Sequence, residues 1–130
     1  MLMFNKYLLI QYIEFDQIYT AIHPLHIYQI IINLVSNAIE ASIQSENKKI
    51  IIILRKFKNN FYIDCRDYGE GISKEQLSKI CTYNFSTKSK ERGFGLYSIT
   101  YIIENILKGI IHIESESNQG SLFSCEIPLT

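Results

Sequence analysis

The sequence predicts an α+β fold in which helices cover one face of a single sheet. Segments with strand and helix patterns follow in the order strand, strand, helix, strand, strand, helix, loop, helix, strand, strand. Short turns join neighbouring strands, which favours antiparallel hairpins. With 130 residues, 47% of them hydrophobic, the chain suits one compact domain over residues 1–130. We therefore expect a two-layer sandwich with three helices on one face of a mixed, mostly antiparallel sheet.

The first part of the chain contains two predicted strands and a long helix. Residues 7–13 and 17–22 have strand-like composition and are separated by a short acidic turn. Pro24 then begins a helix that runs to about Gln44, because proline is tolerated in the first helical turn. Apolar residues recur at helical spacing along this helix and predict its core-facing stripe: Ile27, Ile31, Leu34, Ala38 and Ala41.

The middle of the chain predicts a hairpin and a short helix. The β-branched run 49–57 and the alternating run 61–66 are joined by a tight turn, which is typical of paired strands. Ser73 and Gln76 have the spacing of a capping box, so a short helix is expected to begin there. Residues 81–92 are polar and irregular, and we expect a mobile loop.

The last part of the chain predicts one more helix and one more hairpin. The helix is expected from about Phe94 to Leu107, with Gly109 as its C-cap. Strands are expected over residues 110–115 and 121–127.

Composition argues against several classes of function. Lys plus Arg and Asp plus Glu number 13 each, whereas a general nucleic-acid binder usually carries a basic excess. The longest apolar stretch, residues 30–43, is interrupted by polar residues and is too short to span a bilayer, so no membrane insertion is expected. The cysteines, Cys65, Cys81 and Cys125, lack the spacing of metal or redox sites and are expected to be small core residues in a reducing compartment.

Two asparagines on the long helix are the first candidate for chemistry. Asn33 and Asn37 lie one turn apart, on a side of the helix that borders the apolar stripe. Helix interiors do not favour asparagine, so the pair is either satisfied at the core edge or contacts a ligand. A carboxamide oxygen can bind Mg²⁺, which usually takes substrate phosphates and water as its other ligands.

Glycine-containing segments are the second candidate. Asp67-x-Gly69-x-Gly71 directly follows a strand, and an aspartate there can accept a hydrogen bond from an exocyclic amine such as that of adenine. An ordinary turn is the alternative explanation. Near the next helix start, Gly93-x-Gly95-Leu96 would expose amides to an anion.

Two cations precede these amides. Lys88 and Arg92 lie in the polar stretch before the helix, and residues 86–92 could close over a triphosphate as a lid. A solvated loop with an ordinary helix cap would explain the same pattern. Gly120-Ser121-x-Phe123, at the start of the final strand, is by itself only a hairpin turn.

Together, the order and spacing of these segments resemble the catalytic domain of histidine kinases. That domain belongs to a broader group with DNA gyrase, the mismatch-repair MutL ATPase and the heat-shock chaperone ATPase. The likeness covers about residues 7–129 and implies the ATP-binding Bergerat fold of that group. The matching segments are an asparagine box at 33–38 and three glycine boxes at 67–71, 93–96 and 120–123. Residues 37–42 and 85–93 further resemble the peptide-sensing kinases of Gram-positive quorum systems.

The resemblance implies a role for each motif in binding ATP and Mg²⁺. Asn37 would coordinate Mg²⁺, Asp67 would bind the adenine amino group, and Gly71 would let the base lie close. Ser121 would help to bind adenine, directly or through water. The implied nucleotide-binding residues are Asn33, Asn37, Asp67, Gly69, Gly71, Ile72, Lys88, Arg92, Gly93, Gly95, Leu96 and Ser121. The implied catalytic residues are Asn33, Asn37, Lys88 and Arg92.

One position bears on the reaction. Relatives that hydrolyse ATP carry glutamate where this chain has Asn33, and an amide cannot accept the proton of an attacking water. We therefore expect slow hydrolysis, with the γ-phosphate kept for transfer to an imidazole.

The expected acceptor is missing from the sequence. His23, His26 and His112 lack the helical-hairpin context of a phosphorylated histidine and are interpreted as structural or surface residues. The resemblance thus implies a separate histidine-bearing dimerisation domain as partner, with a response regulator downstream. It also implies a cytoplasmic module whose parent receptor is membrane-anchored.

Three other functions are less consistent with these residues. Serine kinases of the anti-sigma type tend to carry glutamate at the position of Asn33, as does the nucleic-acid-linked ATPase MutL. A non-enzymatic docking module of the same fold is the third alternative, and the intact asparagine and glycine boxes argue against it.

Overall fold

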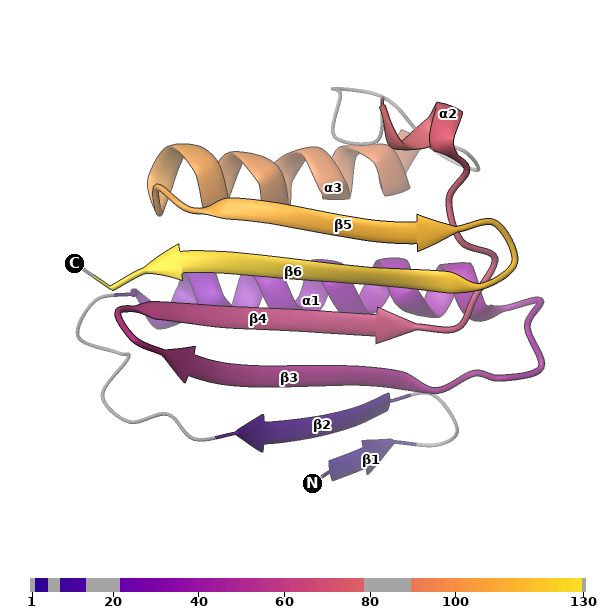
Figure 1. Ribbon diagram of the computed structural model, residues 1–130, viewed down its shortest axis with the longest axis horizontal. Helices are drawn as coiled ribbons and strands as arrows, with labels where there is room; N and C mark the ends of the chain where they lie inside the picture. The colour runs from indigo at the N-terminus through magenta and orange to yellow at the C-terminus, as the bar shows by residue number, and fades with distance from the viewer. Residues whose placement is uncertain (1, 5–7, 14–21, 79–89, 130) are drawn as a thin grey trace.

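The computed structural model describes residues 2–4, 8–13, 22–78 and 90–129. Its strands form one six-stranded sheet in the order β1-β2-β3-β4-β6-β5, with the two longer helices behind it (Figure 1). The strands are β1 Leu2–Phe4, β2 Leu8–Ile13, β3 Ile50–Phe57, β4 Asn60–Asp67, β5 Ile110–Glu116 and β6 Gly120–Pro128. The helices are α1 Pro24–Ser42, α2 Lys74–Leu77 and α3 Lys90–Tyr101, which continues as the π-helical turn η2 Ile102–Ile106. The predicted α+β class, with a mixed and mostly antiparallel sheet, is confirmed.

The N-terminal strands pair differently from the sequence prediction. Strand β2 lies between β1, which is antiparallel to it, and β3, which is parallel to it. Strand β2 therefore has a partner strand on each of its two sides. The sequence did not predict β1. Of the second predicted strand, residues 17–21 lie outside the described residues and Ile22 lies in a bend. A parallel pair needs a crossover connection, and α1 lies between β2 and β3 in the chain.

Helix α1 is capped at both ends by side chains. At its start, Nδ1 of His23 accepts a hydrogen bond from the backbone N–H of Leu25 at 3.0 Å, and Pro24 occupies the first turn. At its end, the Lys48 ammonium donates to the carbonyls of Ser42 at 3.2 Å and Ile43 at 2.7 Å. These contacts fix the helix close to its predicted limits.

The core lies between the sheet and the two longer helices. Strand β4 alternates buried and partly exposed residues, as expected for a strand with one face on a core. Leu34, Ala38 and Ala41 of α1 are buried as predicted, and Ile30 adds a fully buried side chain that the predicted stripe omitted. The fully buried side chains that meet in this layer include Ile30, Ile50, Ile52, Phe61, Ile63, Ile99, Ile103, Cys125 and Ile127.

Two of the three cysteines are core residues, as predicted. Cys65 and Cys125 are buried thiols, whereas Cys81 lies outside the described residues. Burial raises the pKa of the Cys65 thiol strongly, with a further contribution from the nearby Asp67 carboxylate. The thiol is therefore protonated and unreactive at neutral pH.

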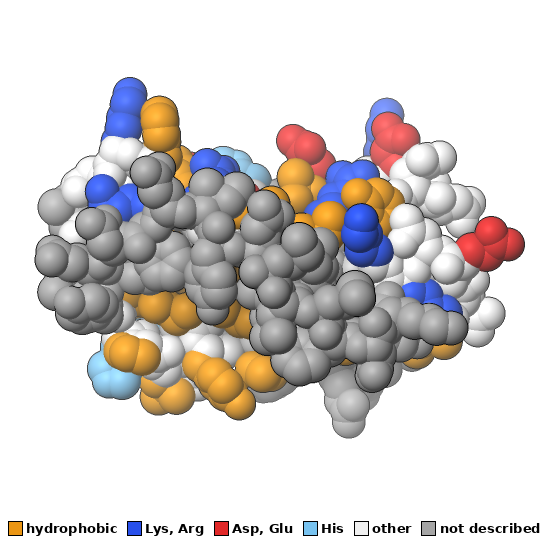
Figure 2. Space-filling view, turned by 90° about the horizontal axis from the view of Figure 1, so that it is seen from below, with side chains coloured by type: hydrophobic (Ala, Val, Ile, Leu, Met, Phe, Trp, Pro, Cys, Tyr) orange, Lys and Arg blue, Asp and Glu red, His pale blue; other side chains and the backbone are white. Residues whose placement is uncertain are grey.

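The two faces of the molecule differ in chemistry. On the open face of the sheet, Arg55 pairs with Asp64 at 3.0 Å, and His112 lies 3.2 Å from Glu126. Figure 2 shows charged side chains mainly along its upper side and hydrophobic side chains along its lower left. Exposed hydrophobic residues on and just after α1 are Leu25, Tyr28, Ile32, Ile39 and Ile43. Within the described segments, no helix is both long and apolar enough to cross a bilayer.

The end of the α3–η2 helix differs from the prediction. The positive φ expected at Gly109 lies instead at Lys108, with φ 59°. Gly109 has another requirement, because a Cβ there would lie 2.2 Å from the Glu126 carbonyl oxygen. Its N–H donates to the Ile103 carbonyl at 2.7 Å. The glycine is needed for the close approach of η2 to β6.

Candidate functional site

Three buried polar side chains mark the site. Within the described segments, the buried polar or charged residues are Asn37, Ser42, Asp67 and Ser121. Ser42 is satisfied by its own helix, since its hydroxyl donates to the Ala38 carbonyl at 2.7 Å. The remaining residues are all positions that the sequence motifs singled out. Burying a polar group costs free energy, so their presence in an apolar interior needs a cause.

The polar side of α1 carries Asn33 and Asn37. The Asn33 amide nitrogen donates to the Gln29 carbonyl at 3.0 Å, in a partly exposed position. Asn37 is only 8% exposed, and its Nδ2 has no hydrogen-bond partner among the described residues. A buried amide without a partner is unusual in native proteins and is consistent with a ligand-binding role.

The loop after β4 is fitted closely against the C-terminal end of α1. Asp67 is 2% exposed, and its Oδ1 accepts a hydrogen bond from the Gly69 N–H at 2.9 Å. A Cβ at Gly69 would lie 2.3 Å from the Ala41 carbonyl oxygen, and the same carbonyl accepts from the Glu70 N–H at 3.0 Å. The loop thus places the Asp67 carboxylate beside the helix that carries the asparagines.

Gly71 is required by the protein itself. It has φ +70°, and a Cβ there would lie 1.9 Å from the Glu116 carbonyl oxygen. The loop is also fastened to the β5–β6 turn, because the Asn118 N–H donates to the Glu70 carbonyl at 2.6 Å. The predicted reason for this glycine was close approach of a base. In the structure, a glycine is also required at this position because the loop packs closely against the end of β5.

A row of polar side chains crosses the sheet at this end. Asp67 of β4 lies opposite Ser121 of β6, which lies opposite Ser115 of β5. The hydroxyls of Ser115 and Ser121 are 2.7 Å apart. The Ser115 hydroxyl also accepts a hydrogen bond from the Ile72 N–H at 2.8 Å. Ile72 was a predicted nucleotide-binding residue, and its N–H is bonded within the protein.

Ser115 is a residue that sequence reasoning missed. The signal was present, since Ser115 occupies a core-facing position of an alternating strand in which Ile111 and Ile113 hold the other core-facing places. A polar side chain there breaks the apolar alternation.

Helix α3 begins earlier than predicted. It starts at Lys90, so the predicted loop residues 90–92 are helical, and Gly93 and Gly95 lie inside the helix. The amides of Gly95 and Leu96 are therefore ones that an α-helix uses in its own hydrogen bonds, unlike those of the first turn. Leu96 has a buried core side chain, 2% exposed. Lys88 lies outside the described residues, as do residues 81–89 of the predicted mobile loop and therefore residues 86–89 of the predicted lid.

The motifs imply a nucleotide slot walled by α1, the Asp67 loop and the start of α3, and these elements adjoin one another. Helix α1 packs beside α3, and it also receives the Asp67 loop through the Glu70–Ala41 hydrogen bond. The asparagine side of α1 and the first turns of α3 therefore belong to neighbouring elements. Within the described segments, no cluster of His, Cys, Asp or Glu could hold a metal ion by itself.

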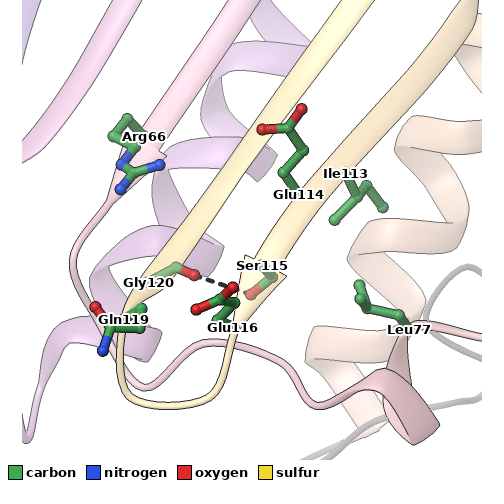
Figure 3. Close-up of a pocket in the computed structure, with 8 residues that line it drawn as sticks. All are labelled: Arg66, Leu77, Ile113, Glu114, Ser115, Glu116, Gln119 and Gly120. Carbon is green, nitrogen blue, oxygen red and sulfur yellow. Dashed lines mark hydrogen bonds between the residues drawn. The ribbon is translucent and has the colours of Figure 1, made fainter.

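A cavity of about 500 Å³ lies beside the polar row of Asp67, Ser121 and Ser115, at the β5–β6 end of the sheet (Figure 3). Its lining residues are Arg66, Leu77, Ile113, Glu114, Ser115, Glu116, Gln119 and Gly120. It touches the polar row at Ser115 but includes neither Asn37 nor Asp67. It is therefore distinct from the slot that the sequence motifs predict.

Comparison with known proteins decides the family. A model of the histidine kinase-, DNA gyrase B- and HSP90-like ATPase family matches residues 22–130. The chain belongs to this family. It is 39% identical over 99 residues to a probable C4-dicarboxylate sensor kinase of Halalkalibacterium halodurans, covering 74% of this chain and 18% of that protein. It is 32% identical over 115 residues to sporulation kinase A of Bacillus subtilis, covering 88% of this chain and 18% of that protein.

A solved structure shares the fold. The catalytic domain of histidine kinase ThkA, in a nucleotide-free form, matches with a TM-score of 0.70 and 38% identity, over 82% of this chain and 68% of that chain. The predicted resemblance to histidine-kinase catalytic domains is thereby confirmed. The chain spans less than a fifth of the length of these two kinases. Neither is named for peptide or quorum sensing, so that subgroup stays a prediction.

Proposed function

We propose that this histidine-kinase catalytic domain binds Mg²⁺-ATP and donates the γ-phosphate to a histidine on a separate domain. The observation that carries the proposal is the burial of Asn37, Asp67 and Ser121 in a mostly apolar interior. They come from different elements, and each lies in a segment that matches a nucleotide-binding motif of the family.

The adenine end would be formed by Asp67 and Ser121. An ionised carboxylate is a pure acceptor, which suits the donating amino group of adenine. The Gly69 N–H holds one carboxylate oxygen of Asp67 in place. Ile72 is buried beside this end, 3% exposed, and would add apolar contact to the base.

The phosphate end would be formed by α1 and the N-terminal part of α3. Asn37 would supply one oxygen to Mg²⁺, with phosphate and water oxygens as the other ligands, as Mg²⁺ prefers. Asn33 would lie near the phosphates, and Lys88 and Arg92 would neutralise their charge. Amides of the first turn of α3 are suited to bind an anion. Contacts from the amides of Gly95 or Leu96 would require the first turns of α3 to open.

Catalysis would rest on positioning and on charge stabilisation. Mg²⁺, when bound, supplies charge neutralisation at the phosphates. Asn33 lacks a basic oxygen, so the site would not activate water, and the γ-phosphate would be preserved for an imidazole.

The acceptor would be a histidine-bearing dimerisation domain of a membrane-anchored parent kinase, with a response regulator downstream. Two histidines of this chain have structural contacts: His23 caps α1, and His112 lies beside Glu126 on the open face of the sheet. These contacts support an acceptor outside this chain. The module would then act in the cytoplasm, where ATP is available.

Nucleotide binding is tested by titrating the purified chain with ADP and with a non-hydrolysable ATP analogue in the presence of Mg²⁺. We expect saturable one-to-one binding with a Kd in the micromolar range. Absence of binding up to millimolar nucleotide would overturn the proposal and favour a docking module of the same fold.

Hydrolysis gives a second and independent test. We expect the isolated chain to release phosphate from ATP very slowly, because Asn33 cannot act as a general base. Phosphate release measured with a coupled assay at saturating ATP checks this. Turnover as fast as that of a gyrase-type ATPase would contradict the kinase assignment.

A further inference from the structure

Ser115 holds together the end of the sheet where the base would bind. Its hydroxyl oxygen lies 2.8 Å from the Ile72 nitrogen, 3.0 Å from the Gly120 carbonyl oxygen and 2.7 Å from the Ser121 hydroxyl. The first contact fixes the loop after β4, the second fixes the β5–β6 turn, and the third reaches a predicted adenine-binding residue. Figure 3 shows Ser115 and its bond to Gly120 beside the turn.

The hydrogen count at Ser115 determines the direction of each bond. A serine hydroxyl has one proton to donate and two lone pairs to accept with. The Ile72 N–H must donate to it, and the Gly120 carbonyl must accept from it. The one proton of Ser115 is then used, so the contact with Ser121 is satisfied only if Ser121 donates. All three contacts are met by this arrangement and by no other.

The orientation of Ser121 follows from that count. With its proton directed to Ser115, Ser121 has only lone pairs left to offer a ligand. The neighbouring Asp67 is likewise an acceptor. Asp67 and Ser121, which lie opposite each other on β4 and β6, would therefore both need a hydrogen-bond donor on the base.

We propose that Ser115 is a specificity-determining positioning residue, which fixes Ser121 as a hydrogen-bond acceptor and so selects purines with an amino group at C6. This inference rests on the proposed nucleotide site. A purine with a carbonyl at C6 places an acceptor against two acceptors and is rejected, because the buried groups of the site are left unpaired. Removing the Ser115 hydroxyl lets the Ser121 hydroxyl rotate and donate, which relaxes the selection.

The experiment compares the Kd of ADP with that of inosine diphosphate, which carries a carbonyl at C6 and an added proton at N1. Both are measured by calorimetry on the full chain, as wild type and as Ser115→Ala. We expect wild type to prefer ADP by at least about tenfold, and Ser115→Ala to reduce that preference about threefold, since Asp67 still requires a donor from the base. Ser117→Ala, at an exposed position in the β5–β6 turn, is the matched control and should keep the wild-type ratio.

A double-mutant cycle separates orientation from a general structural effect. In a Ser121→Ala background no hydroxyl is left to orient, so adding Ser115→Ala should leave the ADP to inosine diphosphate ratio unchanged. If Ser115→Ala does not fold, Ser115→Cys takes its place, because a thiol is a weak donor and acceptor. The same narrowing of the ratio is expected.

The outcomes are distinguishable. If wild type binds neither nucleotide, the proposed function itself fails. If wild type prefers ADP and Ser115→Ala weakens both nucleotides equally, nucleotide binding stands and the role of Ser115 is overturned. Equal affinity of wild type for the two nucleotides would also overturn it.

Discussion

The two ends of the candidate site are built in different ways. At the sheet end, Asp67 and Ser121 are held by hydrogen bonds to Gly69 and Ser115, and two glycines allow the loop to pack without clashes. At the helix end, Asn37 is nearly as buried, yet its amide nitrogen has no partner among the described residues. At the sheet end, Asp67 and Ser121 have hydrogen-bond partners without a ligand. At the helix end, the Asn37 amide nitrogen has none among the described residues.

This difference separates binding from stability. Side chains at the sheet end serve both the fold and the ligand, so changing them should weaken both. The Asn37 amide nitrogen does not stabilise the ligand-free fold, because a buried polar group without a partner is destabilising. Its contribution is expected only when nucleotide and metal are bound.

The largest expected effect is on stability at the sheet end. Gly71→Ala forces an alanine to φ +70° and places its Cβ 1.9 Å from the Glu116 carbonyl oxygen. We expect a loss of roughly 3 kcal/mol in the free energy of unfolding, because both the backbone strain and the clash must be relieved. Urea denaturation followed by circular dichroism measures it. A midpoint equal to that of wild type would mean that the loop is not fastened as described.

The next effect is on nucleotide affinity at the same end. Asp67→Asn keeps an oxygen for the Gly69 N–H but replaces the ionised acceptor that would meet the adenine amino group. We expect ATP affinity to fall about thirtyfold, or about 2 kcal/mol. The measurement is a calorimetric titration with an ATP analogue.

Asp64→Asn is the matched control for this substitution. Asp64 lies on the same strand but on the open face, where it pairs with Arg55 at 3.0 Å. Its loss should lower stability slightly and leave ATP affinity within about twofold, since a partly exposed ion pair contributes little. Equal losses of affinity in both variants would contradict the placing of the base at Asp67.

Local patterns in the sequence predicted much of this architecture. The capping box of Ser73 and Gln76 forms as predicted, and α1 begins at Pro24 because the proline and the apolar spacing act within a few residues. The hairpin of β3 and β4 was also predicted, since a tight turn fixes its register locally. The asparagine and glycine boxes led to the three buried polar groups of the site.

Other features depend on contacts between distant segments and leave little local signal. The parallel pairing of β2 with β3 joins segments on either side of α1, and the antiparallel pairing of β1 uses residues too few to form a periodic pattern. The left-handed residue at the end of η2 is Lys108, whereas Gly109 is required by its close approach to the Glu126 carbonyl, a contact with a distant strand. Ser115 becomes meaningful only once β5 and β6 are paired.

The most direct test of the contrast between the two ends is a titration of wild type and Asn37→Ala with a non-hydrolysable ATP analogue, with and without Mg²⁺. We expect Mg²⁺ to strengthen binding to wild type about tenfold and to have no effect on Asn37→Ala. The free energy of unfolding of the nucleotide-free variant should stay within about 1 kcal/mol of wild type, because no hydrogen bond of the Asn37 Nδ2 is lost. An equal Mg²⁺ effect in both proteins would contradict the account.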